Sequence, residues 1–171
     1  MLTNFDLENM AKNKYHIPLV SICMKDQLPN KVQNGNYIIN LQSSDEGHGT
    51  HWTAMVIQGK NAIFMDPFGV YPSLEIRDFV KKRKGCHLGF TTQDIQDVKS
   101  SNCGLFCMGF LVYVNGKQNI YQATQEYLQF FSKDLLANDT IIHSFLLSNT
   151  KCGCGRRSRR LNSTSSSCQC A

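Results

Sequence analysis

The stretch "CGLFCMGFLVYVNG", residues 103 to 116, constrains the fold of this chain more than any other. It is apolar almost all round, and a helix without a polar face must be buried on every side. The Asn115-Gly116 pair that follows is typical of a helix end. The sequence therefore predicts a buried central helix, and 171 residues are enough to build one core around it.

The remaining patterns predict a mixture of helices and strands. Helical spacing recurs in four further segments, and β-prone residues follow a turn at Asn34-Gly35. The helical segments are "FDLENMAKNKY", "SLEIRDFVKKRKG" with Gly85 as its C-cap, "YQATQEYLQFFSKDLLAND" and "TIIHSFLLSN". "YIINLQ" is expected to be a strand, and "FTTQDIQDV" a strand or an extended segment.

The segment "HWTAMVIQGKNAIFMDPFG" reads as a hairpin of two β-prone runs around a polar turn. We expect Ile57 to pair with Ala62. That register places Asp66 opposite Thr53, on the same face as His51 and one diagonal step away, which is within side-chain reach. A slip of one residue would separate the two side chains.

Beyond Asn149 the composition shifts to Cys, Gly, Arg and Ser. We expect one domain over residues 1–149 and a basic, disordered tail over residues 150–171. The net charge of +5 comes from that tail, which has five Lys or Arg and no acidic residue. The cysteines of the tail form Cys-x-Cys pairs, whereas zinc sites more commonly have Cys-x₂-Cys pairs. We therefore expect disorder rather than a metal site.

No apolar run reaches 18 residues, and the first residues do not have the order of a signal peptide. We therefore expect a protein that is not secreted and does not associate with membranes. Reduced thiols are the default for cysteines in such a setting.

Cys103 stands where the buried helix begins, and a helix N-terminus lowers the pKa of a thiol and makes it a better nucleophile. Histidine is the natural general base near neutral pH. The hairpin brings His51 next to Asp66, whose carboxylate would fix the imidazole tautomer. Gln96, seven residues before Cys103, and the Cys103 N–H would donate to a developing oxyanion.

Each of these residues also has a structural interpretation. Cys103 would be a core thiol, since cysteine is often buried, His51 a core or surface histidine, and Asp66 a turn residue. Four matched roles in sequence order favour catalysis. Cys107, one helical turn after Cys103, is expected to pack beneath the site rather than act as a resolving thiol, and Trp52 to cap the core.

The motifs "HWTA", "FMDPFG" and "QDVKSSNCGLFC" together resemble the adenovirus protease (adenain-like) family of viral cysteine endopeptidases. That family has His-Trp, an acid before Pro-Phe-Gly, and Gln seven residues before Cys-Gly-Leu-Phe-Cys. The resemblance spans roughly residues 35 to 113. The related SUMO and ubiquitin-like isopeptidases usually have Gln six residues before Cys. Here the acid is Asp instead of Glu, and the tail has no counterpart.

The resemblance implies an α+β fold, with a central mixed β-sheet flanked by helices and the nucleophile at the N-terminus of a buried helix. It implies Cys103 as nucleophile, His51 as general base, Asp66 as its orienter and Gln96 as an oxyanion donor. The implied function is cleavage of capsid and core precursor proteins during virion maturation, in the virion and in the host nucleus or cytoplasm. No cofactor, metal or organic, is obligatory for such acyl transfer.

The same resemblance implies two activators, a short viral peptide and DNA. A cysteine about ten residues before the glutamine forms a disulfide with the peptide, and Cys86 lies ten residues before Gln96. Two basic clusters would contact DNA non-specifically. They are Lys81, Lys82, Arg83 and Lys84, and in the tail Arg156, Arg157, Arg159 and Arg160. For Cys86 the alternative is a structural thiol, and for the two basic clusters it is a solvated charged face. For the tail, nuclear targeting is a further alternative.

Three other functions stay open from the sequence. The nearest is a deubiquitinating or deSUMOylating isopeptidase that uses the same catalytic residues. The second is an acetyltransferase, because one bacterial effector family shares the His, acid, Cys order. The third is a non-catalytic nucleic-acid-binding virion protein, in which the basic tail is the working part.

Overall fold

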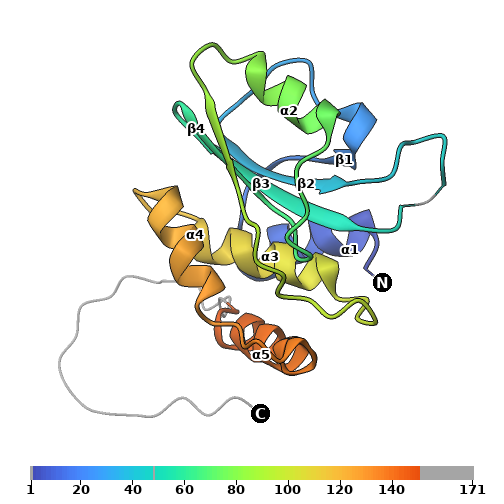
Figure 1. Ribbon diagram of the computed structural model, residues 1–171, viewed down its shortest axis with the longest axis vertical. Helices are drawn as coiled ribbons and strands as arrows, with labels where there is room; N and C mark the ends of the chain where they lie inside the picture. The colour runs from blue at the N-terminus through green and yellow to red at the C-terminus, as the bar shows by residue number, and fades with distance from the viewer. Residues whose placement is uncertain (1, 48, 151–171) are drawn as a thin grey trace, which may run out of the picture.

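The computed structural model describes residues 2–47 and 49–150, which form a five-stranded β-sheet with helices on both faces (Figure 1). The strand order is β1-β2-β3-β4-β5. The central strands β2, β3 and β4 are antiparallel, whereas β1 runs parallel to β2 and β5 parallel to β4. The expected α+β class with a mixed sheet is confirmed. The predicted tail, except for Thr150, lies outside the described residues.

The strands β1 to β5 span Leu19–Met24, Gly35–Asn40, Trp52–Gln58, Asn61–Met65 and His87–Phe90. The helices α1 to α5 span Asn4–Asn9, Leu74–Lys81, Cys103–Val114, Ile120–Leu128 and Leu135–Ser148. A π-helical segment η1 (Met10–Tyr15) extends α1, and a 3-10 turn η2 (Lys25–Gln27) follows β1. None of the helices within the described ranges has the length and apolar character to cross a membrane.

The β3–β4 hairpin has the register that the sequence predicted. Ile57 pairs with Ala62, and the ladder runs from Gln58–Asn61 at the turn to Ala54–Met65 at the open end. His51 immediately precedes β3 and Asp66 immediately follows β4. The two candidate residues therefore lie together at the open end of the hairpin.

Side chains on the central strands alternate between two buried cores. One face packs against α1, α3 and α4, with α5 packed on α3, and includes Ile38, Ala54, Val56, Ile63 and Met65. The other face packs against α2 and includes Tyr37, Ile39, Met55, Ile57, Ala62 and Phe64. Figure 1 shows α2 on the side of the sheet opposite to α3, α4 and α5. Because both faces are covered, β3 is apolar along nearly its whole length.

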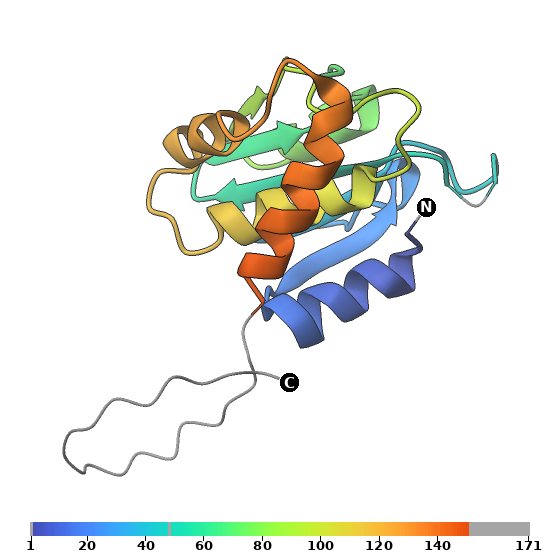
Figure 2. The same cartoon turned by 90° about the horizontal axis from the view of Figure 1, so that it is seen from below.

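The predicted buried helix is α3, which ends at Val114 before the Asn115-Gly116 pair. Nine of its 12 residues are buried. Two glycines let neighbouring elements approach its backbone: Gly104 faces the side chains of Leu2 and Leu7, and Gly109 faces Ile142 and Tyr127. Figure 2 shows α5 crossing α3 on the side away from the sheet.

The structure differs from the sequence-based expectations at four places. Strand β1 was not predicted, because its polar and apolar residues do not alternate cleanly. It becomes a strand through parallel pairing with β2, which is a contact between separate segments of the chain. The segment 90–98, predicted as a strand or an extended segment, belongs to β5 only at Phe90 and is otherwise irregular chain, and β5 itself begins earlier, at His87. Helix α2 ends at Lys81, and Gly85 lies in the turn beyond it with φ +73°. The break between the last two helices falls at 129–134, ahead of the predicted boundary, because Asp134 caps α5.

We predict that Gly109→Ala destabilises the protein, although the same change inside an ordinary helix is stabilising. A β-carbon at this position would collide with Cδ1 of Ile142 and lie 3.0 Å from the Tyr127 hydroxyl. Overpacking of this kind lowers the free energy of unfolding by about 1–3 kcal/mol. Urea denaturation followed by circular dichroism would measure the change.

Ile142→Val provides the control, because it removes Cδ1 and alone costs about 0.5–1.5 kcal/mol. The double variant Gly109→Ala/Ile142→Val should lose less free energy of unfolding than the sum of the losses in the two single variants. Strict additivity would mean that Gly109 does not set the approach of α5 to α3.

Candidate active site

Cys103 is the first residue of α3 and its side chain is buried. The preceding residue, Asn102, does not cap the helix with its side chain. The Asn102 carbonyl accepts the N–H groups of Leu105 and Phe106 at 2.8 and 3.2 Å. The earlier N–H groups of the helix have no such carbonyl partner within it, so the positive end of the helix dipole points at the thiol.

Cys107 fixes the position of α3 against β3. Its Sγ donates to the Trp52 carbonyl at 3.2 Å, and the side chain is fully buried. Burial raises the pKa of the Cys107 thiol well above its ordinary value, so this cysteine stays protonated. The contact places Cys103, one turn earlier, beside the start of β3, where His51 lies. Cys107 thus packs beneath the site.

His51 is held between an acid and a thiol. Its Nε2 lies 2.8 Å from Oδ1 of Asp66, and only 15% of its side chain is exposed. Burial by itself lowers the pKa of His51, but the hydrogen bond to Asp66 and a hydrogen bond with Cys103 raise it from 6.5 to about 9. The imidazole is therefore mostly protonated at neutral pH. Because Nε2 faces Asp66, Nδ1 is the nitrogen left for the thiol.

Asp66 is completely buried and opens the tight turn of the "DPFG" motif. Oδ1 accepts the N–H of Phe68 at 2.8 Å, and the Asp66 carbonyl accepts the N–H of Gly69 at 2.9 Å. Gly69 has φ +67°, and a β-carbon there would lie 2.7 Å from the Thr92 carbonyl oxygen. The ring of Phe68 stacks on His51 with centroids 4.6 Å apart. The motif therefore orients both the carboxylate and the imidazole.

The surroundings of Cys103 favour the thiolate. Burial by itself raises the pKa of the thiol. Hydrogen bonding to His51 and to the backbone N–H groups of Trp52 and Gly104, together with the imidazolium charge, outweighs burial and puts the pKa below its ordinary value of 9.0. The two shifts, a lowered pKa for Cys103 and a raised pKa for His51, favour a thiolate–imidazolium pair.

Gln96 is almost fully buried in the irregular segment between β5 and α3. Its backbone N–H donates to the Pro67 carbonyl at 3.1 Å, which ties it to the turn that starts at Asp66. Nε2 donates to the Ser100 carbonyl at 2.8 Å, and Oε1 has no partner. No hydrogen bond links Gln96 to His51 or Cys103 within the described residues. The structure thus pairs His51 with Asp66 at 2.8 Å, brings the Cys103 thiol close enough for the thiol and the imidazole to shift each other's pKa, and connects Gln96 to the Asp66 turn through the loop.

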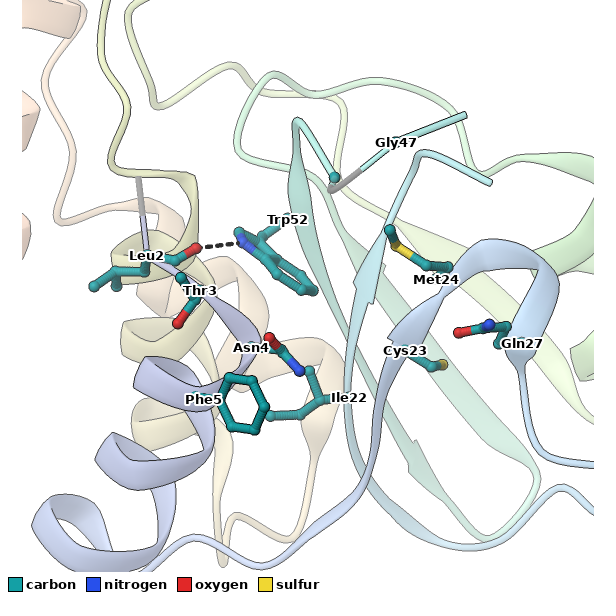
Figure 3. Close-up of a pocket in the computed structure, with 11 residues that line it drawn as sticks. Leu2, Thr3, Asn4, Phe5, Ile22, Cys23, Met24, Gln27, Gly47 and Trp52 are labelled. Carbon is teal, nitrogen blue, oxygen red and sulfur yellow. Dashed lines mark hydrogen bonds between the residues drawn. The ribbon is translucent and has the colours of Figure 1, made fainter. Parts of the chain in front are cut away.

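A cavity of about 630 Å³ lies beside Trp52, and His51, Asp66, Gln96 and Cys103 are not among the residues that line it. Trp52, which directly follows His51, lines it, and Nε1 of Trp52 donates to the Leu2 carbonyl at 2.9 Å. Figure 3 shows the indole ring between the N-terminal segment and the end of β1. The lining includes Leu2, Phe5, Ile22, Cys23, Met24 and Trp52. The cavity is therefore mainly apolar.

Cys86 lies outside this arrangement. It immediately precedes β5 and lines a second cavity of about 390 Å³ with Tyr71, Arg77 and Phe90 among its neighbours. Burial raises the pKa of its thiol, although the Arg83 charge opposes this. Cys86 is thus a free, half-buried thiol of low reactivity.

The first basic cluster is exposed except for Arg83, and part of its charge is engaged locally. Nζ of Lys81 lies 3.1 Å from Oδ1 of Asp78, and the Arg83 guanidinium donates to Oδ1 of Asn34 at 2.7 Å. The second cluster, Arg156, Arg157, Arg159 and Arg160, lies outside the described residues, as do the paired cysteines of the tail. Among the residues described, no group of three or more His, Cys, Asp or Glu side chains could hold a metal ion.

Sequence reasoning named the candidate catalytic residues but missed the groups that hold them. Phe68 stacks on the imidazole, the Pro67 carbonyl anchors Gln96, and Ser100 accepts the Gln96 amide. The first two belong to the "DPFG" motif, whose spacing signalled a turn without showing its contacts. No signal in the sequence singles out Ser100.

We predict that iodoacetamide modifies Cys103 with a midpoint below pH 9, because its pKa is lowered. His51→Ala should move the midpoint upward, since burial then acts without the imidazolium. Asp66→Asn should raise the midpoint by less than His51→Ala does. An asparagine side chain is a weaker partner for His51 than a carboxylate, so the pKa of His51 falls, but the imidazole ring is still present. Mass spectrometry of peptides labelled across pH would give each midpoint.

Cys107 serves as the internal control and should remain unlabelled in the folded protein, because it is fully buried. Equal midpoints for Cys103 in wild type and His51→Ala would mean that the two side chains do not share a proton.

Comparisons with known proteins add no family to this description. No protein-family model matches the chain, and no curated protein matches it. The functional assignment therefore depends on the residues and the geometry of the site.

Proposed function

We propose that this protein is a cysteine endopeptidase of the adenain-like kind. One observation carries the proposal: Cys103 begins a buried helix and interacts with His51, whose Nε2 lies 2.8 Å from the buried carboxylate of Asp66. A structural thiol would not need a lowered pKa or an oriented imidazole. Nucleophilic catalysis needs both.

In the first half of the reaction the Cys103 thiolate attacks a peptide carbonyl carbon. The developing oxyanion would accept the N–H of Cys103 and the second N–H of Gln96 Nε2, since the bond to Ser100 uses only one of the two. As the C–N bond breaks, Nδ1 of His51 gives its proton to the leaving amine. The product is a thioester on Cys103.

In the second half water hydrolyses the thioester. Neutral His51 takes a proton from the attacking water, and the C–S bond breaks to release the carboxylic acid and the thiolate. The carboxylate of Asp66 stabilises the imidazolium at each stage. This chemistry uses only side chains of the chain itself.

The large cavity beside Trp52 supports a peptide substrate. It is mainly apolar and is lined by Trp52, the residue after His51, so it suits an apolar side chain of an extended polypeptide. The "HWTA", "FMDPFG" and "QDVKSSNCGLFC" motifs further favour viral capsid and core precursors as the substrates. Activation by a peptide disulfide at Cys86 and by DNA belongs to the same proposal and is testable separately.

We expect the full-length chain to cleave peptides from a random mixture and Cys103→Ala to cleave none, because the nucleophile is removed. The reaction would be followed by mass spectrometry of new termini, with and without duplex DNA and a reductant. A ubiquitin or SUMO fluorogenic conjugate tests the isopeptidase alternative in the same assay, with rates compared at equal concentration.

Cleavage that persists in Cys103→Ala would contradict the proposal. Exclusive turnover of the folded ubiquitin-like conjugate would transfer the assignment to the isopeptidases. Acetyl transfer from acetyl-CoA without hydrolysis would favour the acetyltransferase instead.

We predict that Phe5→Ala raises KM about tenfold, which corresponds to about 1.4 kcal/mol, and leaves kcat nearly unchanged. Phe5 lines the cavity and is 74% exposed, so its loss removes apolar contact area for the substrate without disturbing the core. Steady-state kinetics with one cleaved peptide would separate the two constants. The matched control is Phe130→Ala, an exposed phenylalanine that does not line this cavity; equal KM changes in both variants would contradict the cavity's role.

A further inference from the structure

The segment 91–102 connects β5 to α3 without a helix or strand. It nevertheless carries Gln96 and ends at Asn102, the residue before Cys103. Oxyanion donors act only if they are held in place before the reaction. Such a segment needs outside support, and α5 supplies it.

Asn138 of α5 provides the first contact and is fully buried. Its Nδ2 donates to the carbonyls of Ile95 and Ser132, each at 3.0 Å, and its Oδ1 accepts the Ser132 N–H at 2.8 Å. Both amide hydrogens are thereby used. Ile95 directly precedes Gln96, so Asn138 fixes the backbone at the start of the loop.

Asp139 provides the second contact through Ser100. The Ser100 hydroxyl donates to Oδ1 of Asp139 at 2.8 Å and accepts the N–H of Asn102 at 3.2 Å. The Ser100 carbonyl accepts the Gln96 amide at 2.8 Å. Ser100 thus joins the glutamine, the residue before the thiol and a carboxylate on α5. A hydrogen bond to an ionised acceptor is stronger than a neutral one.

The position of α5 is itself set by α3. Ile142, one turn beyond Asn138 and buried, packs against the backbone of α3 at Gly109. Figure 2 shows α5 lying across α3. The same helix therefore contacts the middle of α3 and the loop that leads to its first residue.

We propose that Asn138 and Asp139 are positioning residues that hold the two oxyanion donors, the Gln96 amide and the Cys103 N–H, at the place where the oxyanion forms. The inference depends on the proposed protease activity. It assigns α5 a role in the rate of the chemical step beyond its packing. Asp139 is the residue to test, because removing the Asn138 amide would leave buried carbonyls unpaired and would unfold the region.

The test compares Asp139→Ala, Asp139→Asn and wild type in steady-state peptide hydrolysis. Asp139→Ala should lower kcat about 10- to 100-fold, the range for a misplaced catalytic group, with little change in KM. Asp139→Asn should recover most of the loss, because its amide oxygen still accepts from Ser100. The pH midpoint of Cys103 alkylation should not move, because the thiolate depends on His51 and Asp66.

Asp134→Ala is the matched control. Asp134 caps α5 by accepting the Leu136 N–H but makes no hydrogen bond to the segment 91–102, so its loss weakens the helix by about 1 kcal/mol and should leave kcat unchanged. In the Gln96→Ala background, Asp139→Ala should cause a smaller further loss than in wild type.

Unchanged kcat in Asp139→Ala, or an equal loss in Asp134→Ala, would overturn the inference while the protease assignment stood. A shifted alkylation midpoint in Asp139→Ala would also overturn it, because the effect would then reach the thiol itself. A wild-type chain that hydrolyses no peptide would overturn the proposed function and the inference together.

Discussion

The packing of α3 against β3 is the constraint on which the site depends. The helix is apolar on all sides, so it can be stable only where other elements surround it. Glycines let those elements reach its backbone, and the Cys107 contact with the Trp52 carbonyl fixes how far it lies along the strand. Once that position is set, the first helical residue, Cys103, must lie beside the residue that precedes β3, which is His51.

The turn that begins at Asp66 joins the parts that this packing brings close. Its carboxylate orients His51, the Pro67 carbonyl anchors the segment of Gln96, and the Phe68 ring supports the imidazole. Gly69 allows the turn to close against Thr92. Four consecutive residues thus position the candidate base and one candidate oxyanion donor, which explains why a short motif carries so much information about the site.

The electrostatics of the site follow from partial burial. A fully buried carboxylate is costly unless it is paired and hydrogen-bonded, and Asp66 meets that need at Oδ1 with an imidazole and a backbone N–H, whereas its Oδ2 has no hydrogen-bond partner among the described residues. The same pairing raises the pKa of His51, and the resulting positive charge lowers the pKa of Cys103. Cys107, one helical turn after Cys103, has no imidazolium partner, and burial raises its pKa. The difference between the two thiols is one of environment.

The sequence by itself determined the buried helix, the β3–β4 register and the candidate roles of His51, Asp66 and Cys103. These features depend on local periodicity, turn residues and spacing, which are readable along the chain. Only the tertiary structure decided the parallel strands β1 and β5, the end of α2 and the start of α5. It also decided the support of the Gln96 segment by α5, because the contacts from Asn138 to Ile95 and from Asp139 to Ser100 join residues 43 and 39 positions apart and leave no periodic pattern in the sequence.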